Sequence, residues 1–296
     1  MRLGTALRLT RPFTLLAPTV GVVCGARVAT AATGIETDTM ALALAVVSAL
    51  AATAASNAWN QAFDVELDRV NKPSRPLPSG DTSVRAATLL GHVLALAGLL
   101  AGFFVGPWFF ACVTTGTVAT WIYSAPPTRT KRLPWGALLT IAIPRGGLVP
   151  VAGWSVVAVP NVSDPWALGV VGALYVFGAA VTKDFADVKG DRAYGCNTLP
   201  VLLGVERAAR LVAPALIVPF LLYPLLAEAG YLAGPVMPWA VLGGVLSAIG
   251  ALAAVLLMRD PAGLATKGGN HAAWILMYLL LLGSHVGSAI VYASLA

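Results

Sequence analysis

The sequence predicts an all-α membrane protein with nine transmembrane helices. Hydrophobic residues make up 58% of the chain, charged residues only 11%, and the mean hydropathy is +0.80. Soluble domains carry about 25% charged residues, so this composition belongs to the membrane class. Basic residues also gather between alternate apolar stretches, which indicates that the chain crosses a bilayer repeatedly.

Nine apolar stretches approach the length of about 20 residues that a spanning helix needs. They cover residues 12–33, 40–66, 86–106, 108–125, 134–158, 165–187, 208–229, 234–257 and 272–295. The first stretch follows three arginines, as in a secretory signal, but the eight spans behind it favour a retained helix. No stretch of soluble composition interrupts the series, so we expect a single polytopic domain over residues 1–296.

Charge segregation predicts the orientation of these spans. All but Arg27 and Arg145 of the 19 basic residues precede the first span or follow the second, fourth, sixth and eighth spans. The opposite loops contain acidic residues but no Lys or Arg. This positive-inside pattern predicts a cytoplasmic N-terminus and cytoplasmic basic loops. It also explains the net charge of +6 without nucleic-acid binding.

The second span ends in a row of polar side chains. Asn60, Asp64 and Asp68 are four residues apart and share one helix face. An ionised side chain at membrane depth costs several kcal/mol unless another charge compensates it. Ion pairs with the following Arg69 and Lys72 are one interpretation. They leave the polar Asn60, one turn deeper, unexplained, so we favour a binding site.

The sixth span ends in a similar row, as if the motif were duplicated. Asp184, Asp187 and Asp191 predict a second polar face, with Gly190 loosening the helix beside Asp191. Carboxylates on two separate helices need a strong compensating charge. Oxygen ligands suit Mg²⁺, which joins carboxylates to phosphate oxygens. The two motifs therefore predict a Mg²⁺-dependent enzyme that acts on a lipid diphosphate.

Basic residues surround both motifs and suit the phosphates of such a substrate. Three prolines between residues 73 and 78 restrict the loop after the first motif, which an ordinary positive-inside loop does not require. We assign diphosphate binding to Asn60, Arg69, Lys72, Arg75, Arg129, Lys131, Lys183 and Arg192.

Two further residues lie near the predicted site. Tyr123 closes the fourth span and either contacts a phosphate or reacting group or anchors the helix at the membrane interface. Arg145 is the basic residue predicted near mid-membrane, where Pro144 and two glycines indicate a distorted helix. We assign Arg145 to an acidic or phenolic acceptor, with a phosphate or a helix carbonyl as the alternative partner.

Taken in order, these features resemble the UbiA superfamily of intramembrane prenyltransferases. The resemblance rests on the nine spans, the NxxxDxxxD motif at Asn60, Asp64 and Asp68, the Arg-Pro-Leu-Pro-Ser-Gly loop at 75–80, the Tyr-Ser-x-Pro-Pro segment at 123–127, and the DxxxD motif at Asp187 and Asp191. Lys131 matches a diphosphate-contacting position of the family. Gln61 stands where many members have Asp, which is similar to the homogentisate-prenylating branch.

The resemblance implies a helical bundle around a central cavity and transfer of an isoprenyl group from a prenyl diphosphate to a lipophilic acceptor, aromatic or lipid. It implies catalysis by Tyr123 together with Asp64, Asp68, Asp187 and Asp191, which with Asp184 serve as Mg²⁺ ligands. A terpene cyclase of the same superfamily is the alternative enzyme. A transporter or ion-binding protein is the non-enzyme alternative, against which the clustered Arg and Lys residues argue, because they would repel a cation.

Overall fold

A computed structural model describes residues 1–295 of the chain. All regular secondary structure in this range is helical. Eight segments in this range are long and apolar enough to cross a membrane. They are Pro12–Thr33, Thr39–Phe63, Val84–Val105, Pro134–Trp154, Asp164–Ala186, Val205–Glu228, Val236–Arg259 and Ala272–Ala293. Each coincides with a predicted span to within a few residues, which confirms the all-α membrane class.

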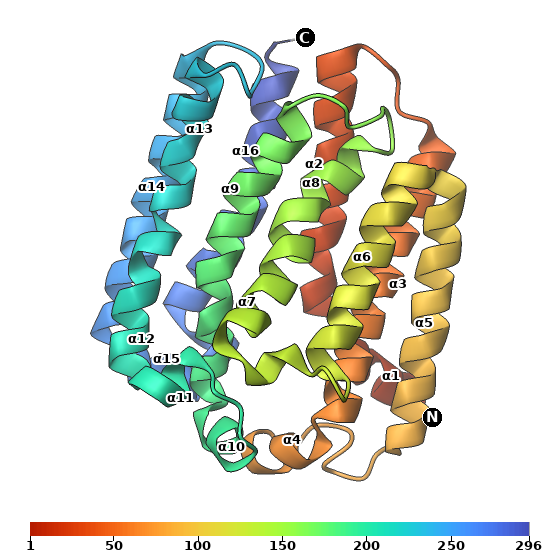
Figure 1. Ribbon diagram of the computed structural model, residues 1–296, viewed down its shortest axis with the longest axis vertical. Coiled ribbons are helices and arrows are strands. Elements are labelled where there is room, and N and C mark those ends of the chain that lie inside the picture. Colours follow the sequence, from red (N-terminus) through yellow and green to blue (C-terminus); the bar gives the residue numbers. More distant parts are fainter. Residues whose placement is uncertain (296) are drawn as a thin grey trace.

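The remaining predicted span, at residues 108–125, forms α6 (Pro107–Ser124). This helix has 18 residues, which include several threonines, and it is not among the eight segments. It packs beside α3 (Thr39–Phe63) and α5 (Val84–Val105), as Figure 1 shows. The two chain termini lie at opposite ends of the bundle, which an odd number of crossings requires.

Figure 1 labels the other α-helices, and some crossings consist of more than one helix. The other long helices are α2 (Leu16–Thr33), α9 (Asp164–Ala179), α13 (Val218–Glu228), α14 (Val236–Arg259) and α16 (Ala272–Ala293). The shorter helices are α1 (Leu3–Thr10), α4 (Val65–Asn71), α7 (Pro134–Ala142), α8 (Leu148–Trp154), α10 (Val188–Ala193), α11 (Leu199–Leu203), α12 (Val205–Val212) and α15 (Pro261–Lys267). Short stretches of 3₁₀- or π-helix are η1 (Pro12–Leu15), η2 (Thr130–Arg132), η3 (Ile143–Gly147), η4 (Ala180–Ala186), η5 (Ala213–Leu216) and η6 (Gly268–Asn270).

Local sequence signals set the helix ends at the end of the bundle opposite the N-terminus. Gly34 ends α2 in the left-handed conformation, with φ of 70°, which glycine adopts without steric cost. The Asp38 carboxylate then accepts a hydrogen bond from the Met40 N–H at 2.9 Å and caps α3. These caps satisfy main-chain groups that would otherwise be unpaired at the helix termini.

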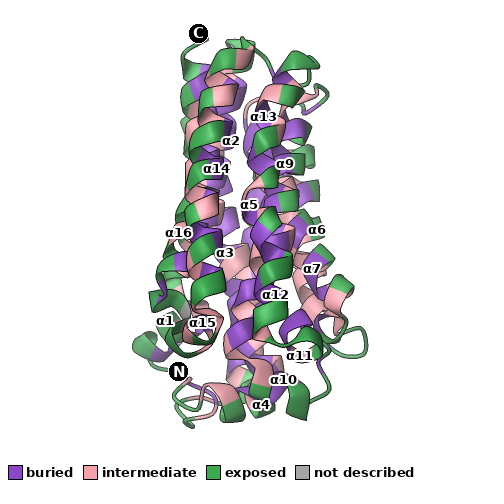
Figure 2. Ribbon diagram, turned by 90° about the vertical axis from the view of Figure 1, so that its left-hand side faces the viewer, coloured by how far each residue is buried: buried purple, intermediate pink, exposed green. Residues whose placement is uncertain are grey.

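The crossings pack as a closed bundle. Neighbouring pairs run from α2 and α3 through α6, α7, α9, α13 and α14 to α16, which returns to α2. Buried residues face the interior and exposed residues face outward in Figure 2. Towards the C-terminal end, α2 approaches α8 so closely that a Cβ on Gly25 would lie 2.8 Å from the Gly153 Cα. This close packing closes one half of the bundle, and the predicted site lies in the other.

Candidate active site

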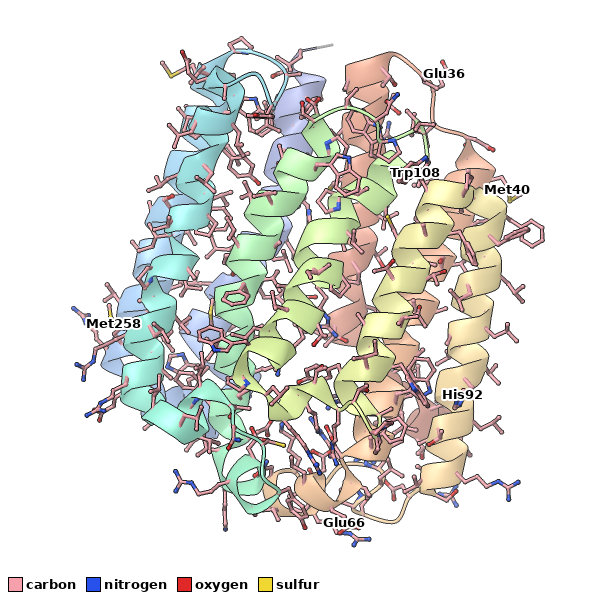
Figure 3. All side chains as sticks on the ribbon, viewed as in Figure 1. Glu36, Met40, Glu66, His92, Trp108 and Met258 are labelled. Atoms are coloured by element: carbon pink, nitrogen blue, oxygen red, sulfur yellow. The ribbon has the colours of Figure 1, made fainter. Side chains whose placement is uncertain are left out.

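Both aspartate motifs lie at the end of the bundle that holds the N-terminus. The two motifs occupy α4 and α10 and the turns that precede them, and these two short helices pack against each other (Figures 1 and 2). Glu66 on α4 and Glu36 beyond α2 mark the opposite ends of the molecule in Figure 3. The fold thus brings together two segments that are more than a hundred residues apart in the sequence.

The central aspartate of each motif interrupts its helix in the same way. α3 ends at Phe63, and Asp64 has φ of −105° and ψ of 10° before α4 begins. Asp187 has φ of −109° and ψ of 0° between η4 and α10. The prediction that the second helix continues unbroken to residue 66 is therefore wrong. The prediction that the sixth helix loosens near Gly190 is also wrong, because Gly190 lies within α10 and the break is at Asp187. The shared break agrees with the predicted duplication of the motif.

Asp64 is buried and has three polar partners. Asn60 donates from Nδ2 to its carboxylate at 2.8 Å, and Arg129 donates from Nη2 at 3.1 Å. Lys131, itself buried, forms a closer ion pair with the same carboxylate. The main-chain bonds from Asp64 to Asn60 and from Asp68 to Asp64 persist through the break, so the predicted polar row survives.

Asp68 is almost completely buried and binds one guanidinium group. Arg75 Nη1 lies 2.6 Å from both carboxylate oxygens of Asp68. Burial raises the pKa of the Asp68 carboxyl, and Arg75 opposes that shift. The proline-containing loop after α4 folds back to bring Arg75 to the motif.

The second motif binds basic side chains from both halves of the chain. Lys72, in the loop after α4, forms an ion pair with Asp187. Lys183 lies 2.6 Å from Asp184 and donates to the Tyr123 hydroxyl at 2.9 Å. Its ammonium nitrogen is also 5.3 Å from the centre of the Tyr123 ring. Tyr123 therefore reaches the site from α6.

Asp191 differs from the other four aspartates of the two motifs. It is buried and accepts a hydrogen bond from the Thr198 hydroxyl at 3.2 Å, but within residues 1–295 it has no basic partner. Burial, followed by the nearby Asp184 and Asp187 carboxylates, raises the pKa of Asp191 to about 7. The second motif therefore carries more negative charge than its basic neighbours compensate.

The donor set suits Mg²⁺. Within residues 1–295, no three acidic, His or Cys side chains are close enough to hold a metal ion as they stand, because four carboxylates hold basic side chains instead. All the donors are nevertheless hard oxygen atoms, which Mg²⁺ prefers. Repulsion between Asp191 and its two acidic neighbours also favours a cation among them.

Two of the predicted diphosphate residues do not join this cluster. Arg69 is 59% exposed and pairs with Glu66, three residues away on the outer surface of α4. Arg192 is exposed on α10. The other basic residues of the prediction all contact a motif aspartate.

Arg145 lies on the predicted helix distortion. Ile143–Gly147 forms one turn of π-helix between α7 and α8, which confirms the irregularity expected from Pro144. The Arg145 side chain is exposed. It has no carboxylate partner among the described residues.

Arg11 is a site residue that the sequence reasoning missed. Its Nη2 atom is buried without a hydrogen-bond partner. Burial, followed by the nearby Arg75 guanidinium, lowers the pKa of Arg11 to about 10, and Asp68 and Asp187 act in the opposite direction. Arg11 therefore lies within the electrostatic reach of both motifs. From the sequence, Arg11 is assigned only to the positive-inside pattern, because it directly precedes the first span.

Two amide side chains of α3 hold the turn that carries Arg11. Asn57 donates to the Thr10 carbonyl at 2.7 Å and to the Thr14 hydroxyl at 2.8 Å. Gln61 donates to the Leu9 carbonyl at 2.7 Å. Arg11 itself has φ of 49°, an uncommon conformation for a residue other than glycine. This turn fixes the direction in which Arg11 enters the site.

The chain is similar to known membrane enzymes over most of its length. The UbiA prenyltransferase family matches residues 19–274. Bacteriochlorophyll synthase 33 kDa chain of Cereibacter sphaeroides is 33% identical over 211 residues, which cover 69% of this chain and 68% of that protein. Digeranylgeranylglyceryl phosphate synthase of Ignicoccus hospitalis is 32% identical over 289 residues, which cover 95% and 91% of the two chains.

A solved structure has the same fold. The UbiA homolog from Archaeoglobus fulgidus, in its structure bound to GPP and Mg²⁺, superposes with a TM-score of 0.74. The match covers 96% of this chain and 99% of that chain, at 20% sequence identity. The helical bundle described above is therefore a known architecture.

Proposed function

Because the chain belongs to the UbiA prenyltransferase family, we propose that it transfers an isoprenyl group from a prenyl diphosphate to a lipophilic acceptor within the membrane. The observation that carries this proposal is that both motifs contain a helix break at the central aspartate. The short helices after the breaks, α4 and α10, pack together, and the motif aspartates pair with five basic side chains. Acids and bases in such number suit a metal-bound diphosphate, which presents both kinds of charge.

The carboxylates are the proposed Mg²⁺ ligands. Asp64, Asp68, Asp187 and Asp191 would hold the metal, with Asp184 beside them. When bound, Mg²⁺ neutralises the charge that develops on a departing diphosphate. Among the described residues Asp191 has no basic partner, so it could accept a cation without breaking an ion pair.

The basic side chains are the proposed diphosphate ligands. Lys72, Arg75, Arg129, Lys131 and Lys183 each hold a motif carboxylate. Arg and Lys side chains suit phosphate oxygens, so these donors would turn to the diphosphate once the carboxylates held a cation. The same residues would thus neutralise the acids of the empty site and the phosphates of the filled site. Tyr123, held by Lys183, would lie beside the reacting group.

The acceptor is proposed to be acidic or phenolic and to contact Arg145. This guanidinium is exposed and has no carboxylate partner within residues 1–295. Arg11 is the second unpaired guanidinium of the site and supports binding of an anionic group between the two motifs and Arg145. A terpene cyclase would need a path for its carbocation past these charges, so we favour transfer to a separate acceptor.

The protein is proposed to lie in the bilayer with its N-terminus and both motifs on the cytoplasmic side. The positive-inside distribution supports this orientation. Single cysteines can test it in a background that lacks Cys24, Cys112 and Cys196. Cysteine at Ser74 and at Asn197 should react with an impermeant reagent from the cytoplasmic side, and cysteine at Glu36 from the other. Labelling of positions 74 and 197 from opposite sides would contradict the proposal.

Product analysis tests the proposed reaction. The purified protein would be incubated with Mg²⁺, prenyl diphosphates of several lengths and a lipid extract, and the products would be identified by mass spectrometry. We expect a prenylated acceptor and released diphosphate, neither of which should form when EDTA replaces Mg²⁺. A cyclic hydrocarbon or alcohol formed steadily from the prenyl diphosphate alone would replace the transferase with a cyclase.

A further inference from the structure

Asn71, the last residue of α4, binds the backbone of α10. Its Nδ2 donates to the Asp187 main-chain carbonyl at 3.0 Å, and its Oδ1 accepts from the Gly190 main-chain N–H at 2.8 Å. α4 and α10 pack against each other at this point (Figures 1 and 2). One side chain therefore joins the helix of the first motif to the backbone of the second.

This contact replaces a bond that Asp187 would ordinarily make. Asp187 is the N-cap residue of α10, where an aspartate side chain usually accepts from the second or third N–H of its own helix. The Asp187 carboxylate makes no such bond. Asn71 instead accepts from the N–H of Gly190, the third residue of α10, which has no partner within its own helix. The Asp187 carboxylate pairs with Lys72 of the first-motif loop instead of capping its own helix.

Gly190 makes this contact possible. A Cβ at position 190 would lie 2.5 Å from the Asn71 Nδ2 and 2.8 Å from its Cγ, closer than real Cβ atoms approach. Any other residue would push the amide away from α10. The glycine in the second motif therefore serves the packing of α4 on α10.

We propose that Asn71 is a positioning residue that caps α10 from the first motif and so reserves the Asp187 carboxylate for the metal-bound diphosphate. The inference rests on the proposed function, which makes Asp187 a Mg²⁺ ligand. Without the Asn71 amide, Asp187 turns to cap its own helix, and the site loses a metal ligand. Asn71 thereby couples the geometry of the two motifs.

Substitutions at both partners test the proposal. Asn71→Ala is expected to raise the Mg²⁺ concentration for half-maximal turnover about 10-fold or more, the range found for residues that orient metal ligands. The Mg²⁺-dependent rise in thermal denaturation temperature, measured without substrate, should require a similarly higher concentration. Asn161→Ala is the matched control, because Asn161 is exposed at the far end of the bundle, and it should leave both values unchanged.

The double variant separates this role from general packing. Gly190→Ala alone should resemble Asn71→Ala, because its methyl group displaces the amide. In the Asn71→Ala background the methyl group has no amide to displace, so Gly190→Ala should add little to the Mg²⁺ requirement. Asn71→Asp, which still accepts from Gly190 but cannot donate to Asp187, should lie between wild type and Asn71→Ala.

The proposal fails if Asn71→Ala keeps the wild-type Mg²⁺ dependence in both measurements. It also fails if the increases in Mg²⁺ requirement caused by the two single substitutions multiply in the double variant. A wild-type protein that turns over no prenyl diphosphate would defeat the proposed function, while the denaturation measurement would still test the role of Asn71. Should Asn71→Ala not fold, Asn71→Asp and Gly190→Ala provide the same comparison.

Discussion

The two aspartate motifs have the same backbone form but different charge surroundings. In the first motif, Asp64 has two basic partners and Asp68 one. In the second, Asp184 and Asp187 have one each, whereas Asp191 has none in the described chain. The first motif is therefore neutralised by the protein itself, and the second keeps a negative charge. We infer that an incoming cation gains most at the second motif.

Removing the central aspartate of either motif is expected to have the largest effect. Asp64→Asn and Asp187→Asn should each lower turnover about 10²–10³-fold, because each removes charge stabilisation of the departing diphosphate. Turnover would be measured with saturating prenyl diphosphate and acceptor over a range of Mg²⁺ concentrations. Glu66→Gln, on the exposed face of the same short helix, is the control and should keep full activity. Near-normal Mg²⁺-dependent turnover in either aspartate variant would contradict the shared role of the motifs.

Removing a basic partner should lower the free energy of unfolding more at the first motif than at the second. Lys131→Met leaves the buried Asp64 with Asn60 and Arg129 as partners and should lower the free energy of unfolding by about 3 kcal/mol. Lys72→Met removes an ion pair whose side chains are 28% and 20% exposed, so the loss should be about 1 kcal/mol. Thermal denaturation in detergent without Mg²⁺ would rank the two variants. Equal losses would mean that the first motif is not the more tightly neutralised one.

The two arginines that follow the first motif should differ in substrate binding. Arg75→Ala is expected to raise KM for the prenyl diphosphate about 10-fold, because the Asp68-bound guanidinium is a proposed phosphate donor. Arg69→Ala should leave KM unchanged, since Arg69 pairs with Glu66 on the outer surface. Steady-state kinetics on the two variants test this contrast. An equal rise in both would place Arg69 in the site after all.

Much of this arrangement could be predicted from the sequence because it depends on local patterns. Apolar length gave the spans, and Pro144 beside two glycines gave the distorted helix, which forms a π-turn. The spacing of the aspartates gave the two polar rows. The breaks at Asp64 and Asp187 were not predicted, because aspartate is compatible with either a helix interior or a helix cap.

The partners of the aspartates could not be predicted in the same way. Arg11 enters the site because two amides of α3 hold a turn that is 43 or more residues away in the chain. Asn71 reaches α10 only because two helix ends meet in the folded chain. Arg69 follows Asp68 directly, yet the helical geometry of α4 turns it outward. Such contacts depend on tertiary packing, for which the sequence carries no periodic signal.

The smallest expected effect concerns the unpaired Asp191. Its pKa of about 7 lies above the ordinary value of 3.8, so the folded protein binds this proton more tightly than the unfolded chain does. The free energy of unfolding should therefore fall as the pH rises from about 4 to 7, with no further loss from this group above pH 7. Asp191→Asn removes that penalty and should stabilise the metal-free protein at pH 8, but not at pH 4. The same substitution should abolish the stabilisation that Mg²⁺ gives to the wild type, because a neutral amide no longer offers the surplus charge. Thermal denaturation with and without Mg²⁺ at both pH values measures these differences. If Asp191→Asn instead destabilised the metal-free protein at pH 8, Asp191 would have a cationic partner, and the proposed difference between the two motifs would be wrong.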